Sequence, residues 1–253
     1  MSGLGRGAAA ALVVCVLVGC GPANGAARPS EPAGDPQPTK AAPPSPAARP
    51  RATVPPAPAA PAAPVFTSTI SEITPELAAR MAPSWRSGCP VDLADLRYVT
   101  VTHHGFGSGE VAQGELVVHA DSADDIVSVF RTLFEAGYPI RSLRLVDDFD
   151  ASDDASMAAD NTSAFNCRAI TGGTGWSQHA YGRAIDLNPV ENPYVLGGSV
   201  QPREGRAFAD RAGAPGVIEP GDVVVQAFAA IEWSWGGTWT SPTDYQHFSQ
   251  TGG

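Results

Sequence analysis

The sequence predicts one α+β domain with a small, mainly antiparallel sheet and flanking helices, preceded by a disordered linker rich in proline and alanine. Residues 21–64 hold 14 of the chain's 24 prolines and almost no large apolar side chains. Residues 65–253 instead carry short apolar segments, some with the period of a strand and others with that of a helix. No internal repeat is present. We therefore place the folded domain at 65–253, a length sufficient for one core.

The first 20 residues are typical of a lipoprotein signal peptide. Residues 7–19 form an apolar run that is too short to span a bilayer comfortably and has the pattern of a secretory signal. The run ends in Leu17-Val18-Gly19-Cys20, which resembles a bacterial lipobox. Cys20 would then become the lipidated first residue of the mature protein. An ordinary signal peptide with an incidental cysteine is the alternative.

The linker at 21–64 cannot bury enough apolar surface to offset the entropy lost on ordering. Its prolines favour an extended, semi-rigid spacer. A lipid anchor followed by such a spacer would hold the domain away from a membrane. A tail without a role is the alternative.

The charge of the domain indicates which partners it can bind, and its cysteines indicate the compartment in which it works. Residues 65–253 contain 24 acidic residues, 11 arginines and no lysine, so we expect no nucleic-acid partner and no broad attraction to anionic lipid. Cys89 and Cys167 remain after the signal region, and in an exported chain they most simply form one disulfide. Two buried free thiols are the alternative. The sequence leaves the oligomeric state open.

Local patterns predict the elements in chain order. We expect a short helix from Thr74-Pro75, then strands at 97–104 and 114–120 around a glycine-rich turn. A helix follows from Asp121 or Ser122 to Gly137, with its core side formed by Ile126, Val127, Phe130, Leu133 and Phe134. After it we expect a strand at 143–146, a loop at 147–163, short strands at 167–170 and 183–187, a helix from Asp222 to about Trp233, and a final strand pair from the segments WGGTW and DYQHF.

The stretch WSQHAYGRAIDLNP, residues 176–189, places Asp186 inside an apolar run. A buried charge without a partner costs several kcal/mol, so something must compensate this carboxylate, and a metal ion is one candidate. His179 precedes Gly182, where the chain can turn sharply. In the strand that follows, small Ala184 would share a face with Asp186.

A metal would need a third ligand beside His179 and Asp186. The candidates are His103, His104, His119 and His247. The first three are more often plain strand or surface histidines, whereas His247 has a carboxylate, Asp244, three residues before it. A hydrogen-bonded His179–Asp186 pair without metal is the structural alternative. Trp233, Trp235 and Trp239 could wall a cleft or belong to the core.

These residues resemble the D-Ala-D-Ala carboxypeptidase and L-Ala-D-Glu endopeptidase family of zinc peptidases. The stretch SQHAYGRAID matches the family signature S-x-H-x-x-G-x-A-x-D at all five fixed positions: Ser177, His179, Gly182, Ala184 and Asp186. Asp244-Tyr245-Gln246-His247 matches the second motif, E/D-x-x-H, with aspartate as the acid. FNCR, 165–168, is similar to the segment that carries the family's active-site arginine. The resemblance covers about 165–250 and implies a hedgehog/DD-peptidase-like fold.

The resemblance implies one zinc ion per chain, bound by His179, Asp186 and His247. Two imidazoles and a carboxylate suit zinc, and three protein ligands with an open fourth position are typical of a catalytic site. Asp244 would act as the general base, and Arg168 would stabilise the oxyanion or hold a substrate carboxylate.

Further expectations concern the residues around the zinc. Ser177 and Tyr181 would line the site, and a disulfide at Cys167 would fix the strand of the neighbouring Arg168. If 244–248 were one straight strand, Asp244 and His247 would lie on opposite faces and roughly 10 Å apart. A bend after Pro242-Thr243 would have to bring them to one site.

The function implied is the hydrolysis of peptidoglycan stem peptides, as by a D-Ala-D-Ala carboxypeptidase, in an extracytoplasmic protein anchored to the cell membrane and facing the cell wall. An L-Ala-D-Glu endopeptidase is the alternative within the same chemistry. Two further alternatives are a non-catalytic zinc-bearing module that binds the cell wall, as the shared fold of the hedgehog signalling domains suggests, and a structural lipoprotein without metal.

Overall fold

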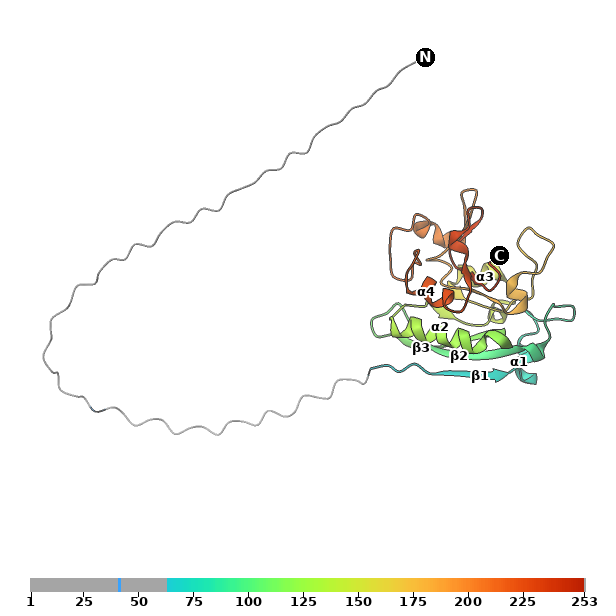
Figure 1. Ribbon diagram of the computed structural model, residues 1–253, viewed down its shortest axis with the longest axis horizontal. Coiled ribbons are helices and arrows are strands. Elements are labelled where there is room, and N and C mark those ends of the chain that lie inside the picture. The colour runs from blue at the N-terminus through green and yellow to red at the C-terminus, as the bar shows by residue number, and fades with distance from the viewer. Residues whose placement is uncertain (1–40, 42–62, 253) are drawn as a thin grey trace, which may run out of the picture. The chain divides into compact units, whose positions relative to one another are not determined.

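The computed structural model describes Ala41 and residues 63–252 (Figure 1). The chain divides into two units, Met1–Pro58 and Ala59–Gly253, and all the described helices and strands lie in the second. The predicted signal peptide, the lipobox with Cys20 and nearly all of the predicted linker fall outside the described residues. Between residues 63 and 252, no helix has both the length and the apolar character that a membrane crossing requires.

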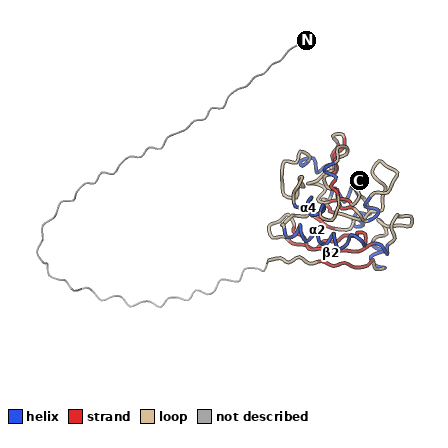
Figure 2. The backbone as a smooth tube through the Cα atoms, viewed as in Figure 1, coloured by secondary structure: helices blue, strands red, loops and turns tan. Residues whose placement is uncertain are grey.

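The domain has the predicted α+β class, with helices and small, mainly antiparallel sheets (Figure 2). The longest sheet has the strand order β1-β2-β3, formed by β1 (Ser68–Glu72), β2 (Leu96–His104) and β3 (Val111–His119). The two predicted strands are β2 and β3. The edge strand β1 was not predicted, because its sequence STISE is mostly polar and nearly all of it is exposed.

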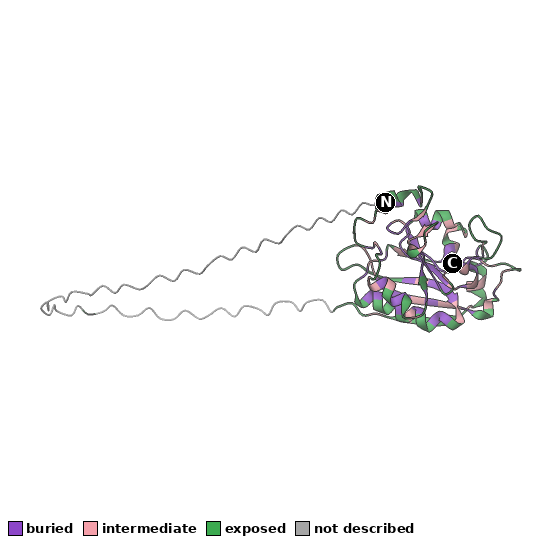
Figure 3. Ribbon diagram, turned by 45° about the horizontal axis from the view of Figure 1, so that its top comes forward, coloured by how far each residue is buried: buried purple, intermediate pink, exposed green. Residues whose placement is uncertain are grey.

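Helix α2 (Ala123–Glu135) covers this sheet and lies between it and helix α4 (Val223–Ala229) (Figure 1). Its residues Ile126, Phe130 and Leu133 are each at most 1% exposed, as the helical period predicted, and buried positions gather where the elements face one another (Figure 3). Val127 is only half-buried, because the core-facing position of that turn belongs to Val129. The α4 helix begins at the predicted cap, Asp222, and ends earlier than predicted.

The second half of the domain carries three smaller sheets. One has the order β6-β11-β9, another β10-β7-β8, and the third pairs β4 with β5 in parallel. Their bounds are β4 Ser142–Leu143, β5 Asn161–Thr162, β6 Ala184–Asp186, β7 Tyr194–Leu196, β8 Ser199–Gln201, β9 Ser234–Trp235, β10 Thr243–Asp244 and β11 His247–Ser249. The predicted single sheet is therefore divided into several short ones.

Three local predictions were wrong. The strand predicted at 143–146 ends at Leu143, and a 3₁₀-helix, Val146–Phe149, follows it. The loop predicted at 147–163 contains helix α3 (Asp153–Ala158), which Ser152 caps by accepting a hydrogen bond from Ala155 N–H. The strand predicted at 167–170 is replaced by one isolated bridge between Ala169 and Trp176.

The remaining helices are short. The predicted helix at Thr74 is α1 (Pro75–Arg80), with the Thr74 hydroxyl accepting from Leu77 N–H at 3.2 Å. Five further 3₁₀-helices lie in the described part of the chain, at Leu93–Asp95, Ala120–Ser122, Gln178–Tyr181, Arg203–Phe208 and Gly236–Thr238.

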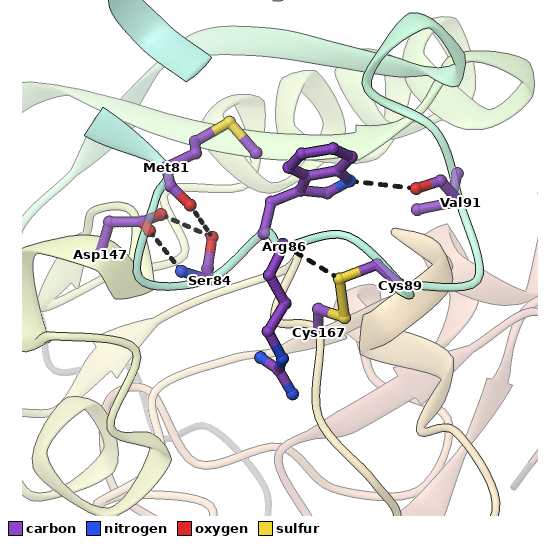
Figure 4. Close-up of a disulfide and its surroundings, with 8 residues drawn as sticks. Met81, Ser84, Arg86, Cys89, Val91, Asp147 and Cys167 are labelled. Atoms are coloured by element: carbon purple, nitrogen blue, oxygen red, sulfur yellow. Dashed lines mark hydrogen bonds between the residues drawn. A yellow bond between two sulfur atoms is a disulfide. The ribbon is translucent and has the colours of Figure 1, made fainter. Parts of the chain in front are cut away.

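Cys89 and Cys167 form a disulfide that spans 78 residues of chain (Figure 4). Beside it, the N–H of Cys167 donates to the carbonyl of Ser84 at 3.1 Å, and the N–H of Arg86 donates to the Cys89 sulfur at 3.3 Å. The disulfide thus ties the loop after α1 to the segment that leads into Arg168.

The buried carboxyl of Glu191 makes the stability of the domain depend on pH. Glu191 is 4% exposed, one of its oxygens has no hydrogen-bond partner, and its ion pair with Arg141 is long, at 3.6 Å. Burial, followed by the neighbouring Asp160, raises the pKa of Glu191 from 4.5 to about 7. Because the folded-state pKa is raised, the stabilising contribution of this group is complete below pH 4.5 and is lost as the pH rises through 7.

We therefore expect Glu191→Gln to raise the free energy of unfolding at pH 8 by on the order of 1–3 kcal/mol and to leave it little changed at pH 4.5. Urea unfolding at both pH values measures this difference. Glu204→Gln, at an exposed position, is the matched control. A variant whose stability changes with pH as the wild type's does would contradict the assignment.

Candidate functional site

His179 lies in the short 3₁₀-helix Gln178–Tyr181, whose ends are determined by the motif residues. The hydroxyl of Ser177 accepts a hydrogen bond from His179 N–H at 3.3 Å and caps the helix start. Gly182 ends the helix with φ +67°, and a Cβ on it would lie 2.6 Å from the backbone nitrogen of His119. Both the backbone conformation and the close approach therefore require glycine at 182.

Asp186 and His247 come from paired strands. In the antiparallel register of β6 and β11, Asp186 lies directly opposite His247. Both side chains are buried, Asp186 to 5% and His247 to 8% residual exposure. The strand pairing alone therefore brings two residues that are 61 positions apart in the sequence into contact.

The three predicted ligands meet at one point. His179 Nε2 lies 3.1 Å from Asp186 Oδ2, His247 Nδ1 lies 2.9 Å from Asp186 Oδ1, and the two ring nitrogens are 3.3 Å apart. His179 Nδ1 lies 2.6 Å from the carbonyl oxygen of Ala164, so this nitrogen carries the proton and donates it there. In the neutral form of the ring, the lone pair of His179 Nε2 then faces Asp186 and His247.

This donor set fits a zinc ion. Zinc bonds to nitrogen and oxygen are about 2.0–2.1 Å long, so tetrahedral ligand atoms stand roughly 3.3 Å from one another. The three separations observed, two of which involve different oxygens of Asp186, range from 2.9 to 3.3 Å and are compatible with this value. Two imidazoles and one carboxylate are also the ligand types that suit zinc, and the carbonyl of Ala164 supplies the outer hydrogen bond that orients a ligating histidine.

The pKa shifts show how tightly Asp186 and its partners are coupled. Burial alone would raise the pKa of Asp186, but the charge and hydrogen bond of His179, with those of His247, hold it well below its usual range. Burial acts to lower the pKa of His179, and the Asp186 carboxylate outweighs it and raises this pKa. The carboxylate is thus tolerated in the core because positive charge meets it, from a protonated imidazole or from a cation.

Asp244 reaches the same site from a different sheet. It ends β10, which pairs with β7, whereas His247 begins β11, so the chain bends between the two strands, at Tyr245-Gln246. Because of this bend, Asp244 and His247 are not forced onto opposite faces of one straight strand. The bend was expected directly after Pro242-Thr243 and lies one residue further along the chain. Gly236 packs against it, since a Cβ there would lie 2.7 Å from the Asp244 carbonyl oxygen and 3.3 Å from the His247 Cβ.

The carboxyl of Asp244 is in an unusual state. Burial, followed by the charge of Asp186, raises its pKa from 3.8 to about 7. Its Oδ1 is buried and has no hydrogen-bond partner in the structure. Such a carboxyl can take up and release a proton near neutral pH, which is the property that a general base requires.

A cavity of about 250 Å³, here called the cleft, opens onto these side chains. Its polar wall includes Arg168, Ser177, Asp244 and two of the ligands, and its apolar wall is formed by Ile170, Trp176, Tyr194, Trp239 and Pro242. Trp239 packs on the ring of His247, with the ring centroids 5.4 Å apart. Trp233 and Trp235 belong to the core.

Arg168 lies in the cleft wall and is held by an acid that sequence reasoning missed. Its Nη2 forms an ion pair of 2.9 Å with Asp153 Oδ2, at the start of α3. The nitrogen Nε of Arg168 is buried and has no hydrogen-bond partner among residues 63–252. Asp153 carried no signal in the sequence, because it falls in an acidic stretch that we expected to be a loop.

Other candidate residues lie elsewhere. Tyr181 was expected to line the same site as Ser177, but it lines a separate cavity with His119 and Arg183, because it lies two positions beyond His179 on the 3₁₀-helix. Of the other histidines, His103 is buried, and its ring lies against the carbonyl of His104. The ring of His104 stacks on that of Phe134, and His119 contacts Arg183. None of these three joins the His179–Asp186–His247 cluster.

The comparisons with known proteins agree with this site. A family model described as D-alanyl-D-alanine carboxypeptidase matches residues 171–250. The chain matches no curated protein and no solved structure. The matched range contains the three clustered residues and Asp244, and begins just after Arg168. Over residues 171–250 the chain thus resembles the D-alanyl-D-alanine carboxypeptidase family, as its motifs predicted.

Proposed function

We propose that this protein is a zinc-dependent peptidase that hydrolyses peptidoglycan stem peptides, with the specificity of a D-Ala-D-Ala carboxypeptidase. The relationship to the peptidase family supports a metallopeptidase that acts on peptidoglycan. The observation that carries the proposal is the His179–Asp186–His247 cluster at the wall of a cleft that also contains the carboxyl of Asp244.

His179, Asp186 and His247 would hold one zinc ion per chain. Bound zinc supplies Lewis acidity, which polarises a carbonyl and lowers the pKa of water. Asp244 accepts a proton from the attacking water and delivers it to the leaving nitrogen. A divalent cation held by the cluster would oppose the shift that burial and Asp186 cause in the pKa of Asp244, and the carboxyl would then be ionised and ready to accept a proton at neutral pH.

Arg168 and the apolar wall would bind the substrate. A guanidinium has five donors in a fixed geometry, which suits either the oxyanion of the transition state or a terminal carboxylate. Ile170, Trp176 and Trp239 would pack against the apolar parts of a peptide and exclude water from the bond that is cut. Ser177 contributes indirectly, by capping the helix that carries His179.

Two other functions remain as outcomes of the same test. An L-Ala-D-Glu endopeptidase would use the same residues on a different bond of the stem peptide. A non-catalytic zinc module would need no proton acceptor, and the buried, unpartnered oxygen of Asp244 in the cleft therefore favours an enzyme.

We also propose that the protein is exported, lipidated at Cys20 and held at the outer face of the cell membrane, toward the cell wall. The lipobox-like sequence supports this location, and so does the Cys89–Cys167 disulfide, because disulfides persist in oxidising compartments. Radiolabelled lipid should enter the wild type in cells and should not enter Cys20→Ala. Equal labelling of both proteins would contradict the anchor.

The experiment that tests the function is incubation of the zinc-loaded protein with a cell-wall pentapeptide, followed by mass spectrometry of the products. Loss of a single terminal alanine is the expected result. A cut after the first residue would identify an endopeptidase instead. Intact pentapeptide and intact wall peptides, with zinc demonstrably bound, would support the binding module.

A further inference from the structure

Asp153 is joined to the cleft by Arg168. The ion pair between Asp153 Oδ2 and Arg168 Nη2 measures 2.9 Å, and each of the two side chains is 25% exposed. Among the described residues, the guanidinium donates one hydrogen bond, which is long, 3.4 Å from Nη1 to the carbonyl oxygen of Ala169. Asp153 is therefore the main side-chain restraint on the orientation of Arg168.

The local structure does not need Asp153 for another purpose. Helix α3 is already capped by Ser152, whose hydroxyl accepts from Ala155 N–H at 3.2 Å. In the described part of the chain, the carboxylate of Asp153 forms no ion pair other than the one with Arg168. Burial raises the pKa of this carboxyl, and Arg168 opposes that shift. The protein thus keeps a half-buried acid whose partner is a residue of the cleft wall.

The charges around the cleft give this acid a second effect. Asp153, Asp186 and Asp244 carry three negative charges when ionised. Arg168 and a divalent cation together carry three positive charges, so the loaded site is balanced only if Asp153 is counted. An unbalanced charge in a buried site is costly, and Asp153 therefore favours both the guanidinium and the cation.

We propose that Asp153 is a positioning residue that orients Arg168 in the cleft and balances its charge. This inference rests on the proposed function of the site, but the orientation of Arg168 can be measured without any catalysis. A small displacement of a group that contacts the substrate reduces turnover, so we expect Asp153→Asn to lower kcat/KM for the peptide by about 10- to 100-fold.

The direct readout is the Nε–H signal of Arg168 in an NMR spectrum of the metal-free full-length protein at pH 7, assigned by its absence in Arg168→Ala. Because Nε is buried, this proton should be protected and visible in the wild type. It should broaden or exchange with water in Asp153→Asn and persist in Asp154→Asn. Asp154 is the matched control, since it is the next residue of α3 and is exposed. A signal that is unchanged in Asp153→Asn would overturn the proposal.

Kinetics provide the second readout, as a double-mutant cycle. If Asp153 acts through Arg168, Asp153→Asn should cause no further loss of kcat/KM in an Arg168→Ala background. Equal losses in both backgrounds, or the same loss in Asp154→Asn, would show a merely structural role. Asp153→Glu should recover part of the activity, because it keeps the charge. A wild type that cuts no peptide would refute the proposed function, while the NMR comparison would still decide the role of Asp153.

Discussion

Asp186→Asn is expected to lower the affinity for zinc at pH 7 by more than about 100-fold and to abolish peptide hydrolysis. Replacing even an outer partner of a metal ligand typically costs 10- to 100-fold in affinity, and Asp186 is a proposed ligand itself. Asparagine has nearly the same shape as aspartate but lacks the negative charge that meets the cation. In the structure the Asp186 carboxylate contacts the imidazoles of both His179 and His247, at 3.1 and 2.9 Å, so its charge is central to the cluster.

Zinc affinity can be measured by competition with a chromophoric chelator. Asp210→Asn, which removes an exposed acid, is the control for the change in net charge and should bind zinc as the wild type does. Circular dichroism should show that Asp186→Asn is folded. If the folded variant binds zinc within about threefold of the wild type, the proposed ligand set is wrong.

Asp244→Asn should separate catalysis from metal binding. We expect kcat to fall by about 10²- to 10⁴-fold, the range that general acid–base catalysis contributes, while zinc still binds. Although the substitution lowers kcat, it should raise the stability of the metal-free protein at pH 8. Because burial and Asp186 raise the pKa of Asp244 to about 7, its stabilising contribution is present below pH 3.8 and is lost as the pH rises through 7. The asparagine variant should therefore unfold at a higher temperature than the wild type at pH 8.

The measurements are single-turnover rates with zinc-loaded protein and thermal unfolding of the metal-free protein at pH 5 and pH 8. A variant that turns over peptide at the wild-type rate would refute the role of Asp244 as base. A loss of turnover together with a loss of zinc would assign Asp244 to the metal site instead of to proton transfer.

Periodic segments of the fold were predictable from the sequence, and short irregular ones were not. Strands β2 and β3 and helix α2 are long enough for their apolar pattern to decide the structure. Strand β1 is held by pairing with β2 and not by burial, so its polar sequence carried no such pattern. Helix α3 was missed because its acidic sequence resembles a loop, and the cap at Ser152 determines it locally.

The site shows the same division. The three clustered residues and Asp244 belong to motifs with fixed spacing, and His179, His247 and Asp244 line one cleft. Neither Asp153 nor the Ala164 carbonyl could be recognised, because each acts through a tertiary contact with a residue that is 15 positions away. Gly236, which lies between β9 and β10, packs against the bend between Asp244 and His247. Tyr181 lies close to His179 in the sequence, but closeness in the sequence does not determine the side of a 3₁₀-helix on which a side chain lies.

We propose that His179, Asp186 and His247 bind the metal with which this protein cuts cell-wall peptides. The most direct measurement is the rate of pentapeptide hydrolysis by chelator-treated protein as zinc is added back, with Asp186→Asn in parallel. We expect no hydrolysis without zinc, recovery that saturates at one zinc per chain in the wild type, and no recovery in the variant. Hydrolysis that persists without metal, or equal recovery in the variant, would contradict it.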